Sequence, residues 1–338
     1  MSPENNNKTR ITLIGGSGFV GSRLISLLHK DNRYIIKNID LRPSYFHNDI
    51  TEIGDVRKQE ELIEYLKDTD IVILLAAMHR DDISPISLYY ETNVEGMKNT
   101  LQAMNICGVK QIVFFSSVAV YGLDKNNPDE SYDPDPSNDY GKSKLQAEVF
   151  LKAWQNTHPD LKITVIRPTV IFGERNRGNV YNLLKQIVSG RFAMIGRGEN
   201  RKSMAYVGNI VAFVKFILEK QETLFEIYNY VDKPDFTMKA LVEYIECSFN
   251  RKVRTIHLPY IVGLMAGYFF DVLAFIMQKR LLISSVRVKK FCATTEFDAL
   301  KVQQTGFVSP YTLKIGLART IDFEFVNTRS EDVVFKSE

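Results

Sequence analysis

A tyrosine and a lysine four positions apart are the residues of this chain whose spacing best suits proton transfer. Both lie in the run YGKSK, from Tyr140 to Lys144, which opens a segment of helical pattern. Positions i and i+4 of a helix share one face, so the phenol and the ammonium would project into the same space. A free phenol titrates near ~10, and a nearby positive charge lowers that value. The pair could act as a general base, although such spacings also occur on ordinary helices.

A run with two serine hydroxyls supports a catalytic role for this pair. SSVAVYG, residues 116–122, ends a predicted strand over Gln111–Ser116. In a doubly wound sheet the carboxyl ends of the strands line the ligand crevice. A serine hydroxyl at that edge can hydrogen-bond the oxygen that loses its proton. We therefore predict that a serine of this run forms one catalytic set with Tyr140 and Lys144.

A glycine-rich run near the start of the chain has the form of a phosphate cradle. GGSGFVG, residues 15–21, stands between a predicted strand over Ile11–Ile14 and a predicted helix over Gly21–Lys30. Glycines let the backbone approach a pyrophosphate, and the start of the helix offers unpaired N–H groups. Because both flanking elements are of the right kind, we favour a dinucleotide site over a purely structural turn.

Two acidic positions follow the next predicted strands. Asp40 comes nineteen positions after Gly21, where a carboxylate can accept from both ribose hydroxyls of an adenosine. A carboxylate there would repel a 2′-phosphate, so Asp40 favours NAD, while Arg42 keeps NADP as the alternative. Asp55 and Val56 follow the next turn and could contact the adenine edge. Asp55 could equally be the N-cap of the helix that follows.

Short β-branched runs alternate with longer helical patterns from Arg10 onwards. This alternation predicts βαβ units and an α/β fold of Rossmann type, with a doubly wound parallel sheet. We expect an NAD-binding domain over residues 1–175 and a smaller substrate lobe over 176–338, from which later segments can return to the sheet. The predicted strands are Ile11–Ile14, Tyr34–Ile39, Ile71–Ala77, Gln111–Ser116 and Lys162–Ile166, and the predicted helices are Gly21–Lys30, Glu60–Lys67, Tyr90–Cys107 and Lys142–Asn156.

The composition argues against several classes of protein. Of the 338 residues 45% are hydrophobic, which allows a sizeable core, and the formal net charge of +3 is too near neutral to suggest a nucleic-acid partner. Cys107, Cys247 and Cys292 form no CxxC pair, so we expect reduced thiols in a cytosolic protein. The histidines show no metal-ligand spacing, and we expect no metal. Residues 1–10 are polar, and we expect no signal peptide.

Taken together, the motifs resemble a known family. GGSGFVG, Asp40, LLAAMH, SSVAVYG, YGKSK and RPTVIFG are similar, in this order, to the NAD-dependent nucleotide-sugar epimerase/dehydratase family of extended short-chain dehydrogenase/reductases. The resemblance implies that Tyr140 is the base, that Lys144 binds the nicotinamide ribose and tunes Tyr140, and that Ser117 assists at the reacting oxygen. The residues expected to contact NAD are Gly15, Ser17, Gly18, Phe19, Val20, Gly21, Asp40, Asp55, Val56, Leu75, Ala76, Ala77, His79, Asn93, Ser116, Tyr140, Lys144, Pro168 and Val170.

One departure from that family narrows the reaction. Its 4,6-dehydratases carry an Asp-Glu pair where this chain has Val118 and Ala119. Valine and alanine cannot exchange protons, so the elimination of water is disfavoured. Epimerisation at a carbinol carbon remains, or a simple reduction.

A basic loop and one lysine are the candidates for substrate binding. Arg175 and Arg177, with the N–H groups at the helix start around Asn179 and Val180, could clamp a diphosphate. Lys202 falls where members of the family place an arginine on the diphosphate, although a lysine makes only a point contact. Solvated surface charge is the alternative for each cation.

One stretch is unusually apolar. Over residues 258–277 large apolar side chains cover most of a helix, beside a stripe of small or polar residues at Gly263, Gly267, Asp271, Ala274 and Gln278. Such a helix could pack its stripe on protein and offer the rest to lipid, with the segment taken as 258–283. The alternative is a helix buried in the substrate lobe or in a subunit interface. The basic residues that follow and would suit anionic headgroups are Lys279, Arg280, Arg287, Lys289 and Lys290.

Longer runs resemble one subgroup of the family. SMAYVGNIV, YNYVDKP and SSVRVKKFCATT are similar to the bacterial 4-epimerases that invert C4 of N-acetylglucosamine on undecaprenyl diphosphate in O-antigen assembly. This implies an isomerase that recycles its NAD, a lipid-linked sugar diphosphate as substrate, and a peripheral or monotopic place at the cytoplasmic face of the bacterial inner membrane. A soluble UDP-sugar 4-epimerase and an NAD(P)H-consuming 4-ketoreductase are the alternatives. Whether the chain forms a homodimer stays open.

Overall fold

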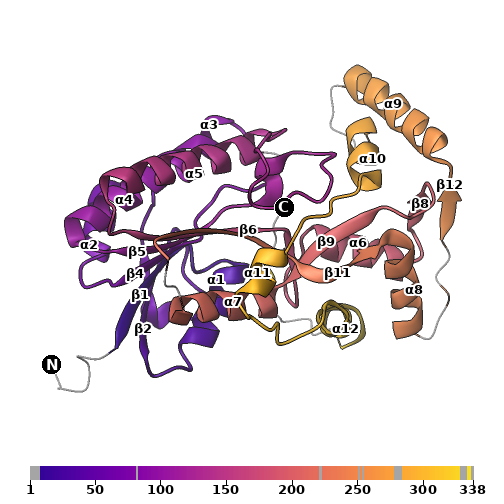
Figure 1. Ribbon diagram of the computed structural model, residues 1–338. Helices are drawn as coiled ribbons and strands as arrows, with labels where there is room; N and C mark the ends of the chain where they lie inside the picture. Colours follow the sequence, from indigo (N-terminus) through magenta and orange to yellow (C-terminus); the bar gives the residue numbers. More distant parts are fainter. Residues whose placement is uncertain are drawn as a thin grey trace.

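The computed structural model describes residues 8–80, 83–220, 223–249, 252, 255–277, 284–327 and 333–335. Its centre is a parallel sheet of seven strands in the order β10-β6-β5-β4-β1-β2-β3 (Figure 1). The predicted Rossmann-type sheet is thereby confirmed. The strands are β1 (Thr9–Ile14), β2 (Tyr34–Asp40), β3 (Thr51–Ile53), β4 (Ile71–Leu74), β5 (Gln111–Phe115), β6 (Lys162–Pro168) and β10 (Phe225–Tyr230).

Helices cover both faces of this sheet (Figure 1). On one face lie α2 (Gln59–Tyr65), α3 (Ser87–Tyr90), α4 (Gly96–Cys107) and α5 (Asp139–Thr157), and on the other lie α1 (Phe19–Leu28) and α7 (Val207–Lys220). The central strands are buried on both faces, which explains their continuous apolar sequence, as in the fully buried run of β4. Two hydrophobic clusters result, one on each side of the sheet.

The strand order reverses at β1, which pairs with β2 on one side and β4 on the other. Connections that leave in opposite directions open a crevice at the carboxyl ends of the strands, where ligands of such folds bind. β4 ends three residues earlier than predicted, because the backbone N–H groups of Leu75 and Ala76 both turn to the Ile14 carbonyl oxygen at 2.8 Å. The residues after β4 therefore line this crevice.

The later part of the chain forms smaller sheets and contributes to the large one. Strands β11, β9 and β7 form a three-stranded sheet, and β12 pairs with β8. Both β10 and α7 come from beyond residue 176 yet belong to the main sheet layers, so the boundary at 175 stays a prediction. The remaining elements are α6 (Asn179–Val188), β7 (Val170–Phe172), β8 (Ala193–Ile195), β9 (Arg201–Tyr206), β11 (Asp232–Thr237), α8 (Met238–Ser248), β12 (Ile256–Leu258), α9 (Tyr260–Met277), α10 (Ser285–Cys292), α11 (Leu300–Gln304) and α12 (Leu313–Ile321), with the short helices η2 (Asn48–Ile50), η3 (Glu91–Glu95), η4 (Val118–Tyr121) and η5 (Asp322–Val326).

Candidate active site

Ser117 lies at the carboxyl edge of the sheet, directly after β5. It is the N-cap of the short helix η4, and its hydroxyl oxygen accepts a hydrogen bond from the Ala119 N–H at 3.1 Å. A hydroxyl that accepts from the backbone keeps its own proton free to donate. Ser117 is thus held by a cap while its O–H can point to a ligand oxygen.

The helix that carries Tyr140 is pressed against η4. Its N-cap is Asn138, whose side chain accepts from the Gly141 N–H at 2.8 Å, so Tyr140 lies in the first turn of α5. A Cβ atom at Gly141 would lie only 2.5 Å from the Ala119 carbonyl oxygen. Glycine is therefore required for this close approach, which brings together the elements of Ser117 and Tyr140.

Lys144 is buried beneath the crevice, with 1% of its surface exposed. Its ammonium donates to the Phe115 carbonyl oxygen at 2.7 Å, and within the described residues it makes no second hydrogen bond. Two of its three N–H groups thus remain for a ligand. Burial lowers the pKa of Lys144 to about 7, and the Glu148 carboxylate opposes that shift. The Lys144 ammonium can therefore lose its proton near neutral pH.

The glycine-rich loop has the shape of a pyrophosphate cradle. Gly15 has a φ of +88°, and a Cβ there would lie 2.4 Å from the Ala76 nitrogen, while a Cβ at Gly21 would lie 2.4 Å from the Gly16 Cα. At Gly18 a Cβ would meet only the Gly15 carbonyl oxygen, at 3.7 Å among the described atoms. Gly18 is also the N-cap of α1 and supplies no side-chain cap. The open side at Gly18 and the uncapped N–H groups fit a bound diphosphate, here that of NAD.

Two side chains of β2 hold this loop in place. Asn38 is fully buried, and its carbonyl oxygen accepts from the Gly16 N–H at 2.9 Å. The Asp40 carboxylate accepts from the Ser17 N–H at 2.9 Å and from the Arg42 N–H at 3.1 Å. Burial raises the pKa of Asp40, and these N–H donors only partly offset the rise. Asn38 was not predicted as a site residue, although an amide within an apolar strand is a visible signal of a buried polar contact.

Asp55 is not the N-cap of the helix that follows. That alternative was wrong, because α2 begins at Gln59 after Lys58, and the Asp55 carboxylate instead binds the Arg57 side chain and backbone. Val56 is buried beside Gly96. Contact of either residue with an adenine stays a prediction.

The predicted cofactor residues after β4 form a loop that Asn93 supports. The Asn93 amide accepts from the Met78 N–H at 2.9 Å and donates to the Met78 carbonyl at 3.0 Å and to the Ser143 hydroxyl at 2.8 Å. Its side chain thereby ties this loop, with Leu75, Ala76, Ala77 and His79, to α5. Direct contact of Asn93 with NAD stays a prediction.

Ser116 differs from its neighbour Ser117. It is buried, and its hydroxyl donates to the Glu148 carboxylate of α5, away from the crevice. Pro168 ends β6 and Val170 begins β7, so both lie at the carboxyl edge of the sheet. Only backbone groups of Ser116 remain for a cofactor.

The predicted arginine clamp has internal partners. The Glu324 carboxylate accepts from the backbone N–H of Arg175 at 2.8 Å and pairs with the Arg177 guanidinium at 3.4 Å. The Arg175 guanidinium lies over the rings of Phe46 and Phe323, at 5.1 and 5.4 Å from their centroids. A diphosphate would have to share the Arg177 guanidinium with Glu324, and the clamp stays a prediction.

The other predicted substrate residues meet different surroundings. Asn179 is exposed at the start of α6, whereas the Val180 side chain is buried, so only its backbone N–H could meet a ligand. The Lys202 ammonium donates to the carbonyl oxygens of Lys290 at 3.0 Å and Ala293 at 2.6 Å, at the end of α10. Burial lowers the pKa of Lys202 to about 8. Lys202 is a link between β9 and α10, and a contact with substrate stays a prediction.

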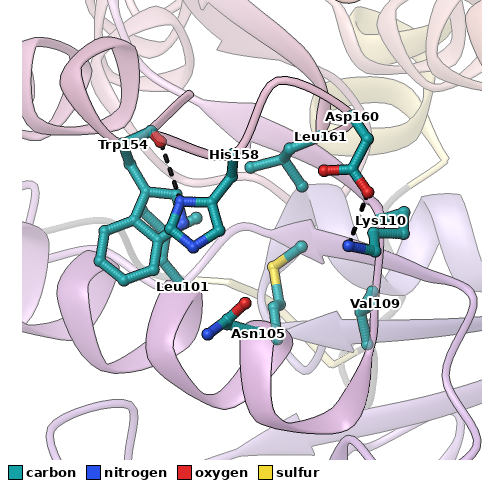
Figure 2. Close-up of a pocket in the computed structure, with 9 residues that line it drawn as sticks. Leu101, Asn105, Val109, Lys110, Trp154, His158, Asp160 and Leu161 are labelled. Atoms are coloured by element: carbon teal, nitrogen blue, oxygen red, sulfur yellow. Dashed lines mark hydrogen bonds and ion pairs between the residues drawn. The ribbon is translucent and has the colours of Figure 1, made fainter. Parts of the chain in front are cut away.

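A hollow between α4 and α5 is separate from this edge. Figure 2 shows its lining, where Trp154 and His158 stack with ring centroids 4.5 Å apart and Lys110 pairs with Asp160 at 2.7 Å. Its volume is about 10 Å³, room for about one water molecule. Trp154 lies fourteen positions after Tyr140, or ~21 Å along the helix. The hollow is no part of the catalytic set.

Comparison with known proteins agrees with this geometry. The chain matches the family described as "NAD dependent epimerase/dehydratase family" over residues 11–230. It is 57% identical over 329 residues to the N-acetyl-alpha-D-glucosaminyl-diphospho-ditrans,octacis-undecaprenol 4-epimerase of Escherichia coli O157:H7, covering 97% of this chain and 99% of that protein. It is 25% identical over 321 residues to a UDP-glucose 4-epimerase of Vibrio cholerae, covering 92% and 94%.

Solved structures share the fold. A UDP-N-acetylglucosamine 4-epimerase from Methanobrevibacter ruminantium M1 aligns with a TM-score of 0.73 at 20% identity, covering 94% of this chain and 98% of that one. A UDP-glucuronic acid 4-epimerase from Bacillus cereus, solved with NAD, aligns with a TM-score of 0.74 at 19% identity, covering 93% and 98%. The family match spans more than half of the chain, and the Escherichia coli relative covers nearly all of it. The chain therefore belongs to the NAD dependent epimerase/dehydratase family.

Proposed function

We propose that this chain is an NAD-dependent 4-epimerase that inverts C4 of N-acetylglucosamine while the sugar is attached to undecaprenyl diphosphate. The observation that carries the chemistry is the convergence of the Ser117, Tyr140 and Lys144 elements beside a glycine loop shaped for a dinucleotide. The substrate rests on the 57% identity to the Escherichia coli enzyme over nearly the whole chain. The product would be the N-acetylgalactosamine lipid used for surface polysaccharide.

The residues of the set have distinct tasks. The Tyr140 phenolate takes the proton of the C4 hydroxyl and later returns it, while the Ser117 hydroxyl holds the same oxygen. The Lys144 ammonium stabilises the phenolate and donates to the nicotinamide ribose. Bound NAD supplies a group that takes a hydride and gives it back. The side chains of Val118 and Ala119 in η4 cannot donate a proton, so these two positions provide no general acid for the elimination of water.

An exposed apolar helix supports the lipid-linked substrate. Helix α9 has 18 residues with a mean hydropathy of 1.9, long and apolar enough to cross a membrane by length and composition, and only 11% of it is buried. Ile261 is 70% exposed and Phe269 65% exposed. An apolar surface of this extent marks an interaction site. The alternative of a helix buried in the substrate lobe disagrees with this exposure.

One narrow side of α9 is held on the protein, and so we propose that it lies in the membrane interface. A Cβ at Gly263 would lie 2.7 Å from Ile195 of β8, and a Cβ at Gly267 would lie 2.7 Å from the Ser285 backbone. The Asp271 carboxylate accepts from the Ser285 N–H at the start of α10. Figure 1 shows α9 on the outside of the molecule, with α10 beside it. Gln278 and residues 279–283 of the predicted segment lie outside the described residues.

The helix next to α9 carries positive charge. Arg287, Lys289 and Lys290 are exposed on α10, and the Lys289 ammonium lies 5.5 Å from the Tyr268 ring centroid of α9. Cations beside an apolar face suit an anionic headgroup layer. We therefore propose a peripheral or monotopic enzyme at the cytoplasmic face of the inner membrane.

The chemistry is tested by Tyr140→Phe. We expect the variant to bind NAD as the wild type does and to lose about 10²–10⁴-fold in turnover, because the general base is gone. Tyr244→Phe is the control, since the Tyr244 phenol donates to the Lys314 carbonyl on the far side of the lobe. Turnover of Tyr140→Phe close to that of this control would refute the role.

The substrate is tested by supplying the lipid-linked sugar and UDP-N-acetylglucosamine separately, each with and without detergent. Inversion of the lipid-linked sugar, at a constant nicotinamide absorbance, is the expected result. Turnover of the nucleotide sugar alone would establish a soluble UDP-sugar epimerase, and stoichiometric loss of NAD(P)H absorbance would establish a ketoreductase.

Membrane binding is tested by vesicle flotation. Ile261→Glu with Phe269→Glu should weaken binding to anionic vesicles by at least ~100-fold, because burial of each side chain contributes about 1.5–3 kcal/mol. Val308→Glu with Val326→Glu is the control, with two charges at exposed apolar positions outside α9. Equal flotation of the two variants would remove α9 as the anchor.

A homodimer is part of the proposal as well. Ile106 on α4 and Val149 on α5 are exposed apolar residues that a second copy could cover. Light scattering of the detergent-solubilised protein tests this, and the mass of a single chain at micromolar concentration would refute it.

A further inference from the structure

A buried charged cluster lies directly beneath the catalytic set. Lys144 and Glu148 on α5 and Arg167 on β6 are exposed by 1%, 5% and 3% of their surfaces. Charges are buried at high cost unless they are paired and hydrogen-bonded, so a cluster of three needs a reason.

Glu148 is the centre of this cluster. The Arg167 guanidinium donates to its carboxylate through Nε, at 3.1 and 3.2 Å, and through Nη2, at 2.5 Å. The Ser116 hydroxyl donates to the same carboxylate. Because Ser116 directly precedes Ser117, Glu148 fixes the end of β5 from which the Ser117 cap starts.

The network continues from Arg167 to η4 and to the neighbouring strand β10. Arg167 Nη1 donates to the Tyr121 hydroxyl at 2.7 Å, and that hydroxyl donates to the Asn229 side chain at 2.9 Å. Tyr121 ends η4, and Asn229 lies in β10. Both ends of η4 are therefore connected to Glu148, through Ser116 on one side and through Arg167 and Tyr121 on the other.

The charges of the cluster do not cancel. Arg167 is always protonated, and a protonated Lys144 makes two cations against the single Glu148 anion. Arg167 binds both carboxylate oxygens, whereas the Lys144 ammonium donates to the Phe115 carbonyl. Glu148 thus acts on Lys144 through space across one helical turn, and the remaining positive charge favours a phenolate at Tyr140.

We propose that Glu148 is a positioning residue of the epimerase site, which holds the Ser116–Ser117 strand end and keeps Lys144 protonated at neutral pH. This inference rests on the proposed roles of Ser117 and Lys144. Among the described residues, the titratable or charged groups that face Lys144 are Tyr140 and Glu148 on α5, His79 after β4, and Arg167 behind Glu148 on β6. Of these, only Glu148 carries a negative charge before Tyr140 ionises.

The test compares Glu148→Gln with Glu148→Asp. The Gln variant keeps the shape and an acceptor but loses the charge, so the alkaline limb of the kcat–pH profile should move about one pH unit lower. The Asp variant keeps the charge but is one methylene shorter, so its limb should stay in place while kcat falls about tenfold at every pH. An unchanged limb in the Gln variant, or an unaltered kcat in the Asp variant, overturns the proposal.

A readout without turnover separates this inference from the proposed function. We would measure denaturant unfolding of the full chain, without added NAD, against pH. Folded Lys144 releases its proton at a lower pH than unfolded Lys144 does, so the free energy of unfolding rises with pH above the folded pKa. This rise should begin near pH 7 in the wild type and about one pH unit lower in Glu148→Gln. The same onset in both proteins overturns the electrostatic role even if the substrate were misassigned. If Glu148→Gln does not fold, the Asp variant still decides the positioning role.

Discussion

Gly141→Ala is the change whose effect follows most directly from the geometry of the site. The added Cβ would lie 2.5 Å from the Ala119 carbonyl oxygen, and ordinary contacts begin near 3.4 Å, so η4 and α5 must separate by roughly 0.9 Å (3.4 − 2.5). In an unconstrained helix alanine would stabilise by about 0.5–1 kcal/mol relative to glycine. Overpacking here opposes that gain with about 1–3 kcal/mol, so we expect a net loss of stability.

The loss of activity should exceed the loss of stability. Ser117 moves with η4 and Tyr140 with α5, and a misplacement of about 1 Å can reduce the rate by ~10²-fold. We would measure kcat with saturating NAD and substrate, together with the midpoint of thermal unfolding and the amount of bound NAD. Lys142→Ala, an exposed position on the same turn, is the control. If Gly141→Ala unfolds at a higher temperature than the wild type and keeps the wild-type kcat, then η4 and α5 are not in close contact there, and the reasoning is refuted.

The remaining predictions concern the cofactor loop and two buried charges. Gly15→Ala should abolish NAD retention, measured in the released nucleotide, because its Cβ would lie 2.4 Å from the Ala76 nitrogen at a φ of +88°. The pKa of Lys144 is about 7 in the folded chain and 10.5 in the unfolded chain, so the unfolded chain binds more protons between these two values. Wild-type stability therefore rises with pH over this range, and Lys144→Met should lack that rise. A parallel rise in Lys144→Met would contradict this. Burial raises the pKa of Asp232 from 3.8 to about 6, so the folded chain binds more protons between these values and wild-type stability falls as the pH rises through them. Asp232→Asn should lack this fall. Both are measured by denaturant unfolding across pH.

The sheet could be predicted because its signals are local. Buried strands such as β4 read as continuous apolar runs, and the loop at Gly15 stands between a strand and a helix. The Tyr140–Lys144 spacing could be read in the same way, since a helix places those residues on one face. Where the signal lay within one short segment, the sequence was sufficient to predict the element.

The contacts between distant segments could not be predicted. Glu148 is recognisable only once β6 places Arg167 opposite it, and Glu324 lies 147 positions after Arg177, which it pairs with. Nothing near Lys202 in the sequence shows that α10 ends beside its ammonium. Such partners depend on tertiary packing, which a single sequence does not display.

The proposed membrane contact and the catalytic set are physically separate. Helix α9 packs on β8 and α10, and Lys202 links α10 to β9. The Glu148 cluster in the main sheet instead contains Lys144 and holds Ser116, which directly precedes Ser117. A lipid surface would therefore act by concentrating a lipid-linked substrate and the enzyme in one layer, which raises the encounter rate without altering the chemistry. It follows that Ile261→Glu with Phe269→Glu should lower turnover on vesicles but retain wild-type kcat on a short-chain substrate in detergent. A fall in kcat there would mean that α9 also acts on the catalytic set through protein contacts, and would refute this explanation.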